Sequence, residues 1–345
     1  MADISVIIPC YNVEKYIDRC LLTITEQTIG VDKLEIICVD DASTDGTVSK
    51  LLEWEQKYPE QIIVVCCEDN GRQGRARNIG LSYASAEWIS HVDADDWVEL
   101  DFYEKLYKVT RENDCEIVSC ESRRDDGKSG LFFPERTSGK GIRYIDIKTE
   151  VERVGFLANK NAGLNAPMKL VKKSLLIDNE IAFPEGVAYE DCYWGMLIHF
   201  YVNKVVMLDE ILYHYAINNT STTLQKGAYY HIDYMVVMKR LWKECERRGL
   251  LQKYRAELEL EVIATFYCDF LKMLSLKFDN PPYSYYMVAQ IMVRECVPDF
   301  RKNYYVSQGG FPEAIMDYIG ALESVNSKKE FEDLIERVRT EKILY

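Results

Sequence analysis

The sequence lacks the features that would place it across a membrane, in the secretory pathway or on nucleic acid. No apolar run approaches the roughly 18 residues that a membrane-spanning helix needs. Met1-Ala2-Asp3 leads straight into an apolar run, so we expect no signal peptide. Positive charge is scarce, because 42 basic residues against 56 acidic ones give a formal net charge of −14. This balance argues against nucleic acid as a partner, since binding to phosphates requires a basic face.

Two kinds of site are also missing. The 11 cysteines are scattered, without a C-x-x-C pair or a Cys/His group at zinc spacing. Five of them, Cys10, Cys38, Cys66, Cys67 and Cys120, lie in strand-like apolar segments, and we interpret them as buried, reduced residues of a cytosolic protein. The first apolar run is not followed by G-x-G-x-x-G, which argues against a dinucleotide-dependent oxidoreductase.

The first 120 residues do show a regular alternation of short apolar runs and amphipathic segments. The predicted strands are 4–9, 34–39, 62–67, 88–92 and 116–120. The predicted helices are 13–27, a segment around 48–54, 74–84 and 101–113. This alternation predicts an α/β fold with a doubly wound, mainly parallel sheet.

Polar clusters follow three of these strands where each strand ends. They are Asp40-Asp41, Asn70-Gly71 and the run from Asp93 to Asp96. Ligands of such sheets bind at the carboxyl ends of the strands. We therefore expect the three clusters to converge on one rim.

The third cluster, Asp93-Ala94-Asp95-Asp96, places three carboxylates within four residues. Their mutual repulsion favours a shared positive partner. Mg²⁺ and Mn²⁺ take oxygen ligands and bind through one or two carboxylates together with substrate phosphates. The alternative is a solvated acidic turn that caps the next helix.

Four segments carry a resemblance to the family 2 glycosyltransferases of the GT-A fold. Residues 39–47 (VDDASTDGT) resemble the family's V-D-D-G-S-x-D-G-T signature, with Ala42 in place of the usual glycine. Residues 70–80 (NGRQGRARNIG) resemble its N-x-G-x-x-x-A-R-N-x-G segment. Residues 8–12 resemble its opening I-P-x-Y-N, and residues 93–96 its D-x-D-D metal site. The resemblance implies a GT-A nucleotide-diphospho-sugar transferase fold.

The resemblance also implies a donor site. The loop with Pro9 and Tyr11 would wall the nucleotide base, and Asp41 would accept a hydrogen bond from a base N–H, which fits uracil. Arg75 or Arg77 would offset phosphate charge, and an ion pair with local acids is the alternative for both. The residues implied for nucleotide-sugar binding are Pro9, Tyr11, Asp41, Asn70, Gly71, Arg75, Arg77, Asp93 and Ala94. Those implied for a Mn²⁺ or Mg²⁺ ion are Asp95 and Asp93, with Asp96 assisting.

A further segment, residues 183–194, resembles the family's P-x-G-x-x-x-E-D motif at the start of a helix. By this resemblance Asp191 is the catalytic base of an inverting transfer, and Glu190 is its neighbour or a ligand of a sugar hydroxyl. The helix N-terminus would lower the pKa of these carboxyls and burial would raise it, and the sequence does not decide between them. Helix capping is the alternative role.

The remainder divides at about residue 222. Residues 212–218 resemble the segment that closes the family's catalytic domain, which predicts a catalytic domain at 1–222 and a helical region at 223–345. His214 is a candidate phosphate or metal contact, although a structural histidine is the interpretation we favour. Helices are predicted around 234–245, 258–274, 314–322 and 331–338. This region carries no recognised motif; it could serve acceptor binding, docking to a membrane enzyme or formation of a homo-oligomer, or could simply pack on the catalytic domain.

The resemblance thus implies an inverting, metal-dependent glycosyltransferase of surface polysaccharide synthesis. It would move a hexose or N-acetylhexosamine from a UDP-sugar to a hydroxyl of a saccharide or lipid-linked saccharide acceptor. We expect a cytoplasmic location, compatible with peripheral association at the inner face of the cytoplasmic membrane. One alternative is a sugar-nucleotide pyrophosphorylase, although residues 9–12 are not the Gly-rich basic loop it requires. Another is an inactive nucleotide-sugar-binding protein, against which the intact Asp93, Asp95 and Asp191 argue.

Overall fold

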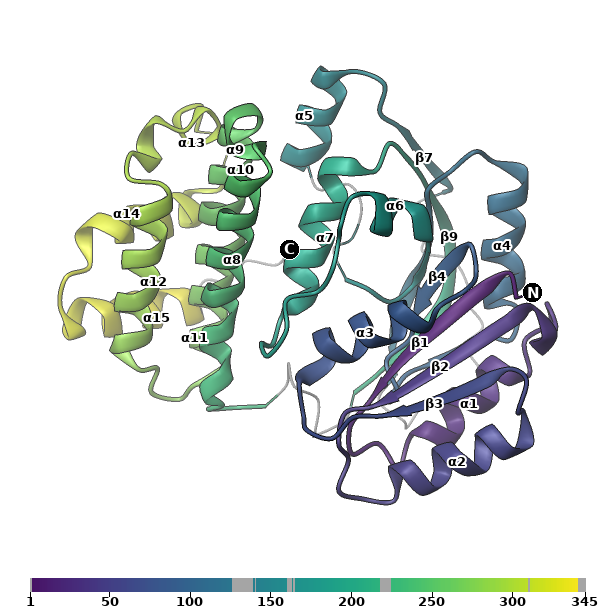
Figure 1. Ribbon diagram of the computed structural model, residues 1–345. Helices are drawn as coiled ribbons and strands as arrows, with labels where there is room; N and C mark the ends of the chain where they lie inside the picture. The colour runs from purple at the N-terminus through teal and green to yellow at the C-terminus, as the bar shows by residue number, and fades with distance from the viewer. Residues whose placement is uncertain are drawn as a thin grey trace. The chain divides into compact units, whose positions relative to one another are not determined.

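The computed structural model describes residues 2–125, 139, 141–159, 163, 165–217, 225–309 and 311–340. Its contacts divide the chain into two compact units (Figure 1). The first unit comprises Met1–Phe156, Lys160–Gly186 and Glu190–Asn218, and the second comprises Leu157–Asn159, Val187–Tyr189 and Asn219–Tyr345. The first is α/β and the second is helical. The predicted domain boundary at residues 222 and 223 stays a prediction.

Within the described residues, the first unit contains one nine-stranded sheet. Its strands are β1 (Ile4–Cys10), β2 (Leu34–Asp40), β3 (Ile62–Cys66), β4 (Trp88–His91), β5 (Trp97–Val98), β6 (Ile117–Asp125), β7 (Arg143–Asp146), β8 (Lys169–Lys172) and β9 (Lys204–Ala216). The order is β3-β2-β1-β4-β8-β6-β9-β5, and β7 also pairs with β9. The five strands predicted in the first 120 residues are therefore present.

The pairing of these strands explains why the sheet is mixed. β1 pairs in parallel with β2 and β4, and β2 pairs in parallel with β3. β8 then lies antiparallel between β4 and β6, so the fourth and fifth predicted strands are not neighbours. β6 pairs in parallel with β9, and β5 and β7 run antiparallel to β9. β9 is one continuous strand of 13 residues.

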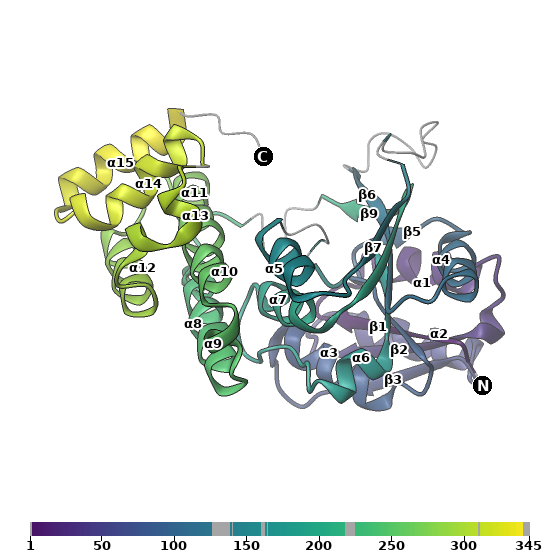
Figure 2. The same cartoon turned by 90° about the horizontal axis from the view of Figure 1, so that it is seen from above.

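Helices cover both faces of the parallel half of the sheet (Figure 2). The helices of this part of the chain are α1 (Ile17–Thr25), α2 (Thr47–Lys57), α3 (Arg72–Tyr83), α4 (Phe102–Glu112), α5 (Glu150–Asn159), α6 (Lys173–Asp178) and α7 (Glu190–Tyr201). Alternate side chains of β1 point to opposite faces of the sheet. Ile4, Val6 and Ile8 join the core beneath α1, α2 and α4, whereas Ile7 lies against Gly80 of α3. A strand buried on both faces must be apolar throughout, which is why its sequence shows no alternation.

The second unit is built from helices in its described part. They are α8 (Asp233–Arg247), α9 (Leu250–Lys253), α10 (Arg255–Leu260), a π-helical stretch (Glu261–Tyr267), α11 (Cys268–Lys277), α12 (Tyr283–Cys296), α13 (Tyr304–Ser307), α14 (Glu313–Ser324) and α15 (Lys328–Thr340). Each of the four predicted helices is present, but α12 was not predicted. No helix among the described residues is long and apolar enough to cross a bilayer.

The cysteine prediction is right for most positions and wrong at one strand. None of the 11 cysteines, all of which the structure describes, forms a disulfide, and Cys10, Cys38 and Cys120 are buried as expected. Cys66 is exposed and Cys67 is only half-buried. The reason is that both lie at the end of β3, which is an edge strand of the sheet.

Candidate active site

The acidic turn Asp93–Asp96 follows β4 directly, and its side chains alternate between surface and core. Asp93 and Asp95 are partly exposed, whereas Ala94 and Asp96 are buried. The Asp96 N–H donates to the Asp93 carbonyl at 2.9 Å, which closes the turn. The Asp93 N–H donates to the hydroxyl of Tyr213 on β9 at 3.2 Å. The turn is therefore fastened to β9, with two of its three carboxylates near the surface.

Asp96 has partners inside the protein for both carboxylate oxygens. The Tyr213 hydroxyl donates to one oxygen at 2.5 Å, and the Ala216 N–H donates to the other at 2.8 Å. Burial raises the pKa of this carboxyl well above its usual value, and repulsion from Asp93 and Asp95 adds to the increase. With 1% of its surface exposed, Asp96 anchors the turn. This geometry argues against the predicted assistance of Asp96 in metal binding.

Arg77 of α3 is the residue that joins the separate motifs. Its side chain is 3% exposed, donates to the Asp93 carboxylate at 2.8 Å and forms an ion pair with Glu190. Its guanidinium carbon lies 5.2 Å from the centroid of the Phe183 ring. Burial alone would lower the pKa of this guanidinium, but the surrounding carboxylates raise it. A permanently charged arginine thus connects the end of β4 with the start of α7.

Glu190 and Asp191 are the first two residues of α7. Burial is the largest influence on both carboxyls and raises their pKa, even though Arg77 lowers it. Repulsion by Asp191 adds to the shift of Glu190, and repulsion by Asp93 adds to that of Asp191. The net effect on both carboxyls is a raised pKa, so burial outweighs the lowering expected from the helix N-terminus. The sequence alone did not decide between these two effects. A carboxylate with a raised pKa is a stronger proton acceptor near neutral pH.

Three of the predicted nucleotide-binding residues are hydrogen-bonded to one another. Asp41 is 2% exposed, and its carboxylate accepts from the Gly71 N–H at 2.8 Å. Its carbonyl accepts from the Asn70 side chain at 3.1 Å, while its N–H donates to the Cys10 carbonyl at 2.8 Å. Burial raises the pKa of Asp41, and the N–H bonds partly counteract this. The ends of β1, β2 and β3 are thus held together at one rim, as expected for parallel strands.

The opening motif lies on the same rim. Pro9 is buried in β1, and the Tyr11 side chain is 48% exposed. The Asn12 side chain accepts from the Thr44 N–H at 2.8 Å, which ties the loop after β1 to the loop after β2. Tyr11 therefore presents an aromatic surface to solvent on a braced loop.

Arg75 differs from Arg77, although either was predicted to offset phosphate charge. Arg75 makes a two-pronged ion pair with Asp69, at 2.9 and 3.1 Å, on the surface of the unit. Residues two positions apart on a helix face different sides, so Arg75 turns outward and Arg77 inward. Both arginines have the acidic partners that were considered as the alternative to phosphate.

The structure limits what could hold a metal ion. Among the described residues, no group of three or more His, Cys, Asp or Glu side chains is arranged to bind one. Asp93 and Asp95 still supply the hard oxygen donors that Mg²⁺ and Mn²⁺ prefer. These two residues fit a cation that takes its remaining ligands from a phosphate and water, rather than a cage built by the protein alone.

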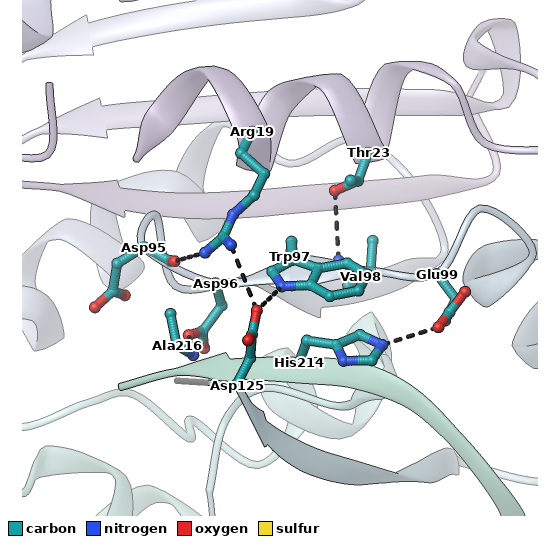
Figure 3. A network of polar contacts seen from close by, with 10 residues as sticks. All are labelled: Arg19, Thr23, Asp95, Asp96, Trp97, Val98, Glu99, Asp125, His214 and Ala216. Carbon is teal, nitrogen blue, oxygen red and sulfur yellow. Dashed lines mark hydrogen bonds and ion pairs between the residues drawn. The ribbon is translucent and has the colours of Figure 1, made fainter. Parts of the chain in front are cut away.

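Sequence reasoning did not single out Trp97, Asp125 or Arg19 (Figure 3). The Trp97 indole stacks on His214 at 3.5 Å between ring centroids and donates to Asp125 at 2.9 Å. His214 is fully buried and lies 2.9 Å from a Glu99 oxygen, which agrees with the structural role that we favoured. Arg19 of α1 contacts Asp125 and the Asp95 carbonyl. No local pattern could reveal these contacts, because the partners are far apart in the chain.

Lys169 of β8 was also not predicted as a site residue. It is buried, and its ammonium donates to the Gly163 carbonyl at 2.8 Å. Burial lowers its pKa to about 8, and Asp191 opposes the decrease. Lys169 lines a cavity of about 380 Å³ together with Trp194 and Ile198 of α7. The helix that begins with Glu190 and Asp191 therefore also forms a wall of this cavity.

Comparison with known proteins places this arrangement among sugar transferases. The family profile "Glycosyl transferase family 2" matches residues 5–178. The chain is 30% identical over 215 residues to poly(ribitol-phosphate) beta-glucosyltransferase of Bacillus spizizenii, covering 62% of this chain and 32% of that protein. It is 25% identical to TarS, poly(ribitol-phosphate) beta-N-acetylglucosaminyltransferase of Staphylococcus aureus, covering 76% and 44%. The matched region is thus less than half the length of both relatives.

Solved structures show the same fold. The crystal structure of S. aureus TarS 1-349 in complex with UDP has a TM-score of 0.70 at 20% identity, covering 100% of this chain and 93% of that chain. The complex of TarS 1-349 with UDP-GlcNAc has a TM-score of 0.67 at the same identity and coverage. The predicted fold class, a GT-A sheet with a helical C-terminal region, is confirmed.

Proposed function

Because the chain belongs to glycosyltransferase family 2, we propose that it transfers a sugar, with inversion, from a UDP-linked donor to an acceptor hydroxyl. Membership of this family sets aside the pyrophosphorylase, and the intact Asp93, Asp95 and Asp191 argue against an inactive binding protein. The observation that carries the proposal is the position of Arg77. It brings the acidic turn, which suits a cation bound to a nucleotide diphosphate, next to Glu190 and Asp191, which suit proton removal.

Asp191 is the catalytic base in this proposal. As the acceptor oxygen attacks C1 of the donor sugar, Asp191 takes the proton of the acceptor hydroxyl. The bond between C1 and the phosphate oxygen breaks, and UDP leaves with the bonding electrons. The raised pKa of Asp191 suits this step, and the ion pair of Arg77 with Glu190 holds the start of α7 in place.

The donor would lie along the rim formed by the ends of β1, β2 and β4. Tyr11 would stack on uracil, and Asp41 would accept from its N–H. A carboxylate offers about four acceptor positions, so the bond from Gly71 leaves Asp41 capacity for this contact. The TarS structures with UDP and UDP-GlcNAc support a uridine nucleotide and a hexose or N-acetylhexosamine.

Asp93 and Asp95 would hold a Mn²⁺ or Mg²⁺ ion in this site. When bound, the ion would stabilise the negative charge that develops on the departing diphosphate. A mannosyltransferase of Pyrobaculum calidifontis, solved with GDP-Man and Mn²⁺, shares the fold at a TM-score of 0.51 and 16% identity. Asp96 has no ligand role in the proposal, because both of its oxygens have internal partners.

The acceptor class comes from the relatives. Two of them are named for transfer to poly(ribitol-phosphate), which supports a hydroxyl of a surface polymer or of its lipid-linked precursor. We therefore place the enzyme in the cytoplasm, meeting its acceptor at the inner face of the membrane. The catalytic domain would be residues 1–222, with residues 223–345 available for acceptor binding or self-association.

Calorimetric binding of UDP, GDP and ADP, with and without Mn²⁺, tests the donor side of the proposal. UDP should bind most tightly, and Asp95→Ala should remove the additional affinity that Mn²⁺ gives. Asp191→Asn should keep UDP binding but lower turnover by about 10²- to 10⁴-fold. The proposal fails if none of the nucleotides binds, or if Asp191→Asn turns over a panel of UDP-sugars as fast as the wild type.

A further inference from the structure

Arg19 of α1 reaches the back of the acidic turn. Its guanidinium donates to the carbonyl of Asp95 at 3.2 Å and contacts the Asp125 carboxylate at 3.5 Å (Figure 3). Its central carbon lies 5.9 Å from the centroid of the Trp97 ring. The side chain is 34% exposed. One arginine thus contacts the turn itself, the residue that follows the turn, and the end of β6.

The partners of Arg19 are themselves fixed. Asp125 is buried and accepts from the Trp97 indole N–H at 2.9 Å. The Trp97 ring stacks on the His214 ring, with an angle of 2° between the two parallel planes. Asp125, the acidic partner of Arg19, is therefore held by its hydrogen bond to Trp97, and Trp97 is held by stacking on His214. A long side chain held in this way loses its freedom to follow a moving turn.

The acidic turn is consequently held from two sides. From β9, Tyr213 and Ala216 bind the Asp96 carboxylate. From α1, Arg19 binds the carbonyl of Asp95, and the Cys20 thiol lies 3.8 Å from the carbonyl of Asp93. Fixing the Asp95 carbonyl fixes the backbone from which the Asp95 side chain projects. The contact is to a backbone oxygen and not to the Asp95 carboxylate.

We propose that Arg19 is a positioning residue that sets the direction of the Asp95 carboxylate toward a nucleotide-bound cation. The inference rests on the proposed function, in which Asp95 is a metal ligand. Outer partners that orient metal ligands typically change metal affinity by about 10- to 100-fold when they are removed. Arg19 acts on the ligand through its backbone. The charge of the guanidinium also offsets the repulsion among the acids of the turn.

The test is the gain in UDP affinity that Mn²⁺ provides, measured by calorimetry as the ratio of Kd without Mn²⁺ to Kd with it. Arg19→Met should lower this ratio by about 10-fold, with Kd for UDP alone unchanged. Arg19→Lys should restore part of the ratio, because an ammonium can still donate to the Asp95 carbonyl. Asp125→Asn keeps an acceptor for Trp97 but removes the charge that holds Arg19, so it should give an intermediate ratio.

Lys105→Met is the matched control. Lys105 of α4 is 30% exposed and also has two acidic partners, Asp101 and Glu210, neither of them in the acidic turn. This variant should keep the wild-type ratio. A purely structural role for Arg19 would lower the thermal midpoint and leave the ratio intact.

Wild-type ratios in both Arg19 variants would overturn the positioning role, whatever their stability. Should Arg19→Met not fold, Arg19→Lys and Asp125→Asn decide the question in the same way. A wild-type protein whose UDP affinity ignores Mn²⁺ would instead overturn the metal role of Asp95, and the role of Arg19 with it. The two failures are therefore distinguishable.

Discussion

The rim of the first unit and the helical region, residues 225–340, differ in how they use left-handed backbone. In the described part of the helical region, every residue with positive φ is a glycine: Gly227, Gly249 and Gly309. Elsewhere, six residues with side chains adopt this conformation: Asn12, Ala42, Arg72, Met168, Glu180 and Tyr189. Such residues cost of order 1–3 kcal/mol each and persist where the surroundings enforce them.

Four of these six strained residues lie next to the sequence motifs of the candidate site. Asn12 ends the opening motif, Ala42 follows Asp40-Asp41, Arg72 follows Asn70-Gly71, and Tyr189 immediately precedes Glu190. Strained backbone of this kind clusters at active sites and ligand clamps. The helical region has the unstrained turns of an ordinary scaffold. Four of the six strained residues therefore lie beside the candidate site, whereas Met168 and Glu180 lie elsewhere in the chain.

The largest expected loss of stability comes from replacing Arg77, which joins the acidic turn to the start of α7. Arg77→Met leaves the Glu190 carboxylate buried without its partner and removes the ion pair of Asp93. Removing one partner of a buried ion pair costs about 3–5 kcal/mol, so the free energy of unfolding should fall by that amount. Urea unfolding at neutral pH measures it.

Arg75→Met, two residues away on the same helix, is the control for this substitution. Its ion pair with Asp69 lies on the surface, and exposed pairs contribute about 0–1 kcal/mol. Equal losses in the two variants would show that Arg77 is not the centre of the rim.

The sequence is sufficient to predict the part of the fold that forms the rim. Strands buried on both faces must be continuous apolar runs, so β1 and β2 are visible in the sequence, and their polar ends follow directly. β8 is not visible, because Lys169–Lys172 is short, half polar and paired only with distant strands. α12 was missed for another reason: apolar side chains surround most of the helix, and no single stripe stands out.

The candidate site could be predicted as a set of residues but not as a set of contacts. The spacing of Arg75 and Arg77 implies opposite faces of a helix, but not which face meets the acids. The acidic turn gave no sign that Asp96 would face inward, since that depends on Tyr213 more than a hundred residues later. The raised pKa of Asp191 likewise depends on burial, which is a property of the assembled structure.

The second prediction compares the effect of a glycine-to-alanine substitution in the first unit with the same substitution in the helical region. Gly74 of α3 lets the helix approach the chain before α7, because a Cβ there would lie 2.5 Å from the Pro184 carbonyl oxygen. Gly74→Ala should lower the free energy of unfolding by about 1–3 kcal/mol. Gly320 of α14 has nothing within 4 Å of such an atom, so Gly320→Ala should raise it by about 0.5–1 kcal/mol. Denaturant unfolding of both variants checks the opposite signs, and a loss in both would remove the contrast.

The third prediction uses acids whose pKa values shift in opposite directions. Burial raises the pKa of Asp191, so its stabilising effect is present below its unfolded pKa and is lost as pH rises through the folded value. Asp191→Asn should therefore raise the free energy of unfolding by about 1 kcal/mol at neutral pH. Asp191→Asn should therefore be more stable than the wild type although it loses turnover. The gain in free energy of unfolding should vanish at acidic pH, where Asp191 is protonated in both states.

Glu244 of α8 is the counterpart in the helical region. Its hydrogen bonds with Arg247 and Arg248 lower its pKa to about 2. Its contribution is therefore present above the unfolded pKa and is lost as pH falls toward the folded value. Glu244→Gln should lower the free energy of unfolding at neutral pH by at most about 1 kcal/mol, because the pairs are partly solvated. Urea unfolding across pH tests both variants, and a shift of the same sign in the two would contradict the comparison.

The smallest expected change in stability comes from Ala42→Gly, which tests whether the positive φ of Ala42 costs free energy. Ala42 has a φ of +63°, at the position where the signature that residues 39–47 resemble has glycine. Ala42→Gly therefore relieves strain of about 1–2 kcal/mol but adds about 0.5–1 kcal/mol of unfolded-chain entropy. We expect a net gain of about 0.5 kcal/mol, read as a higher urea midpoint at unchanged slope. Gly249 has a φ of +73° and only ordinary van der Waals distances around it, so Gly249→Ala should lose about 1 kcal/mol. If Ala42→Gly instead destabilises the protein while Gly249→Ala behaves as expected, the loop after β2 holds Ala42 without strain, and the rim is less strained than its backbone angles suggest.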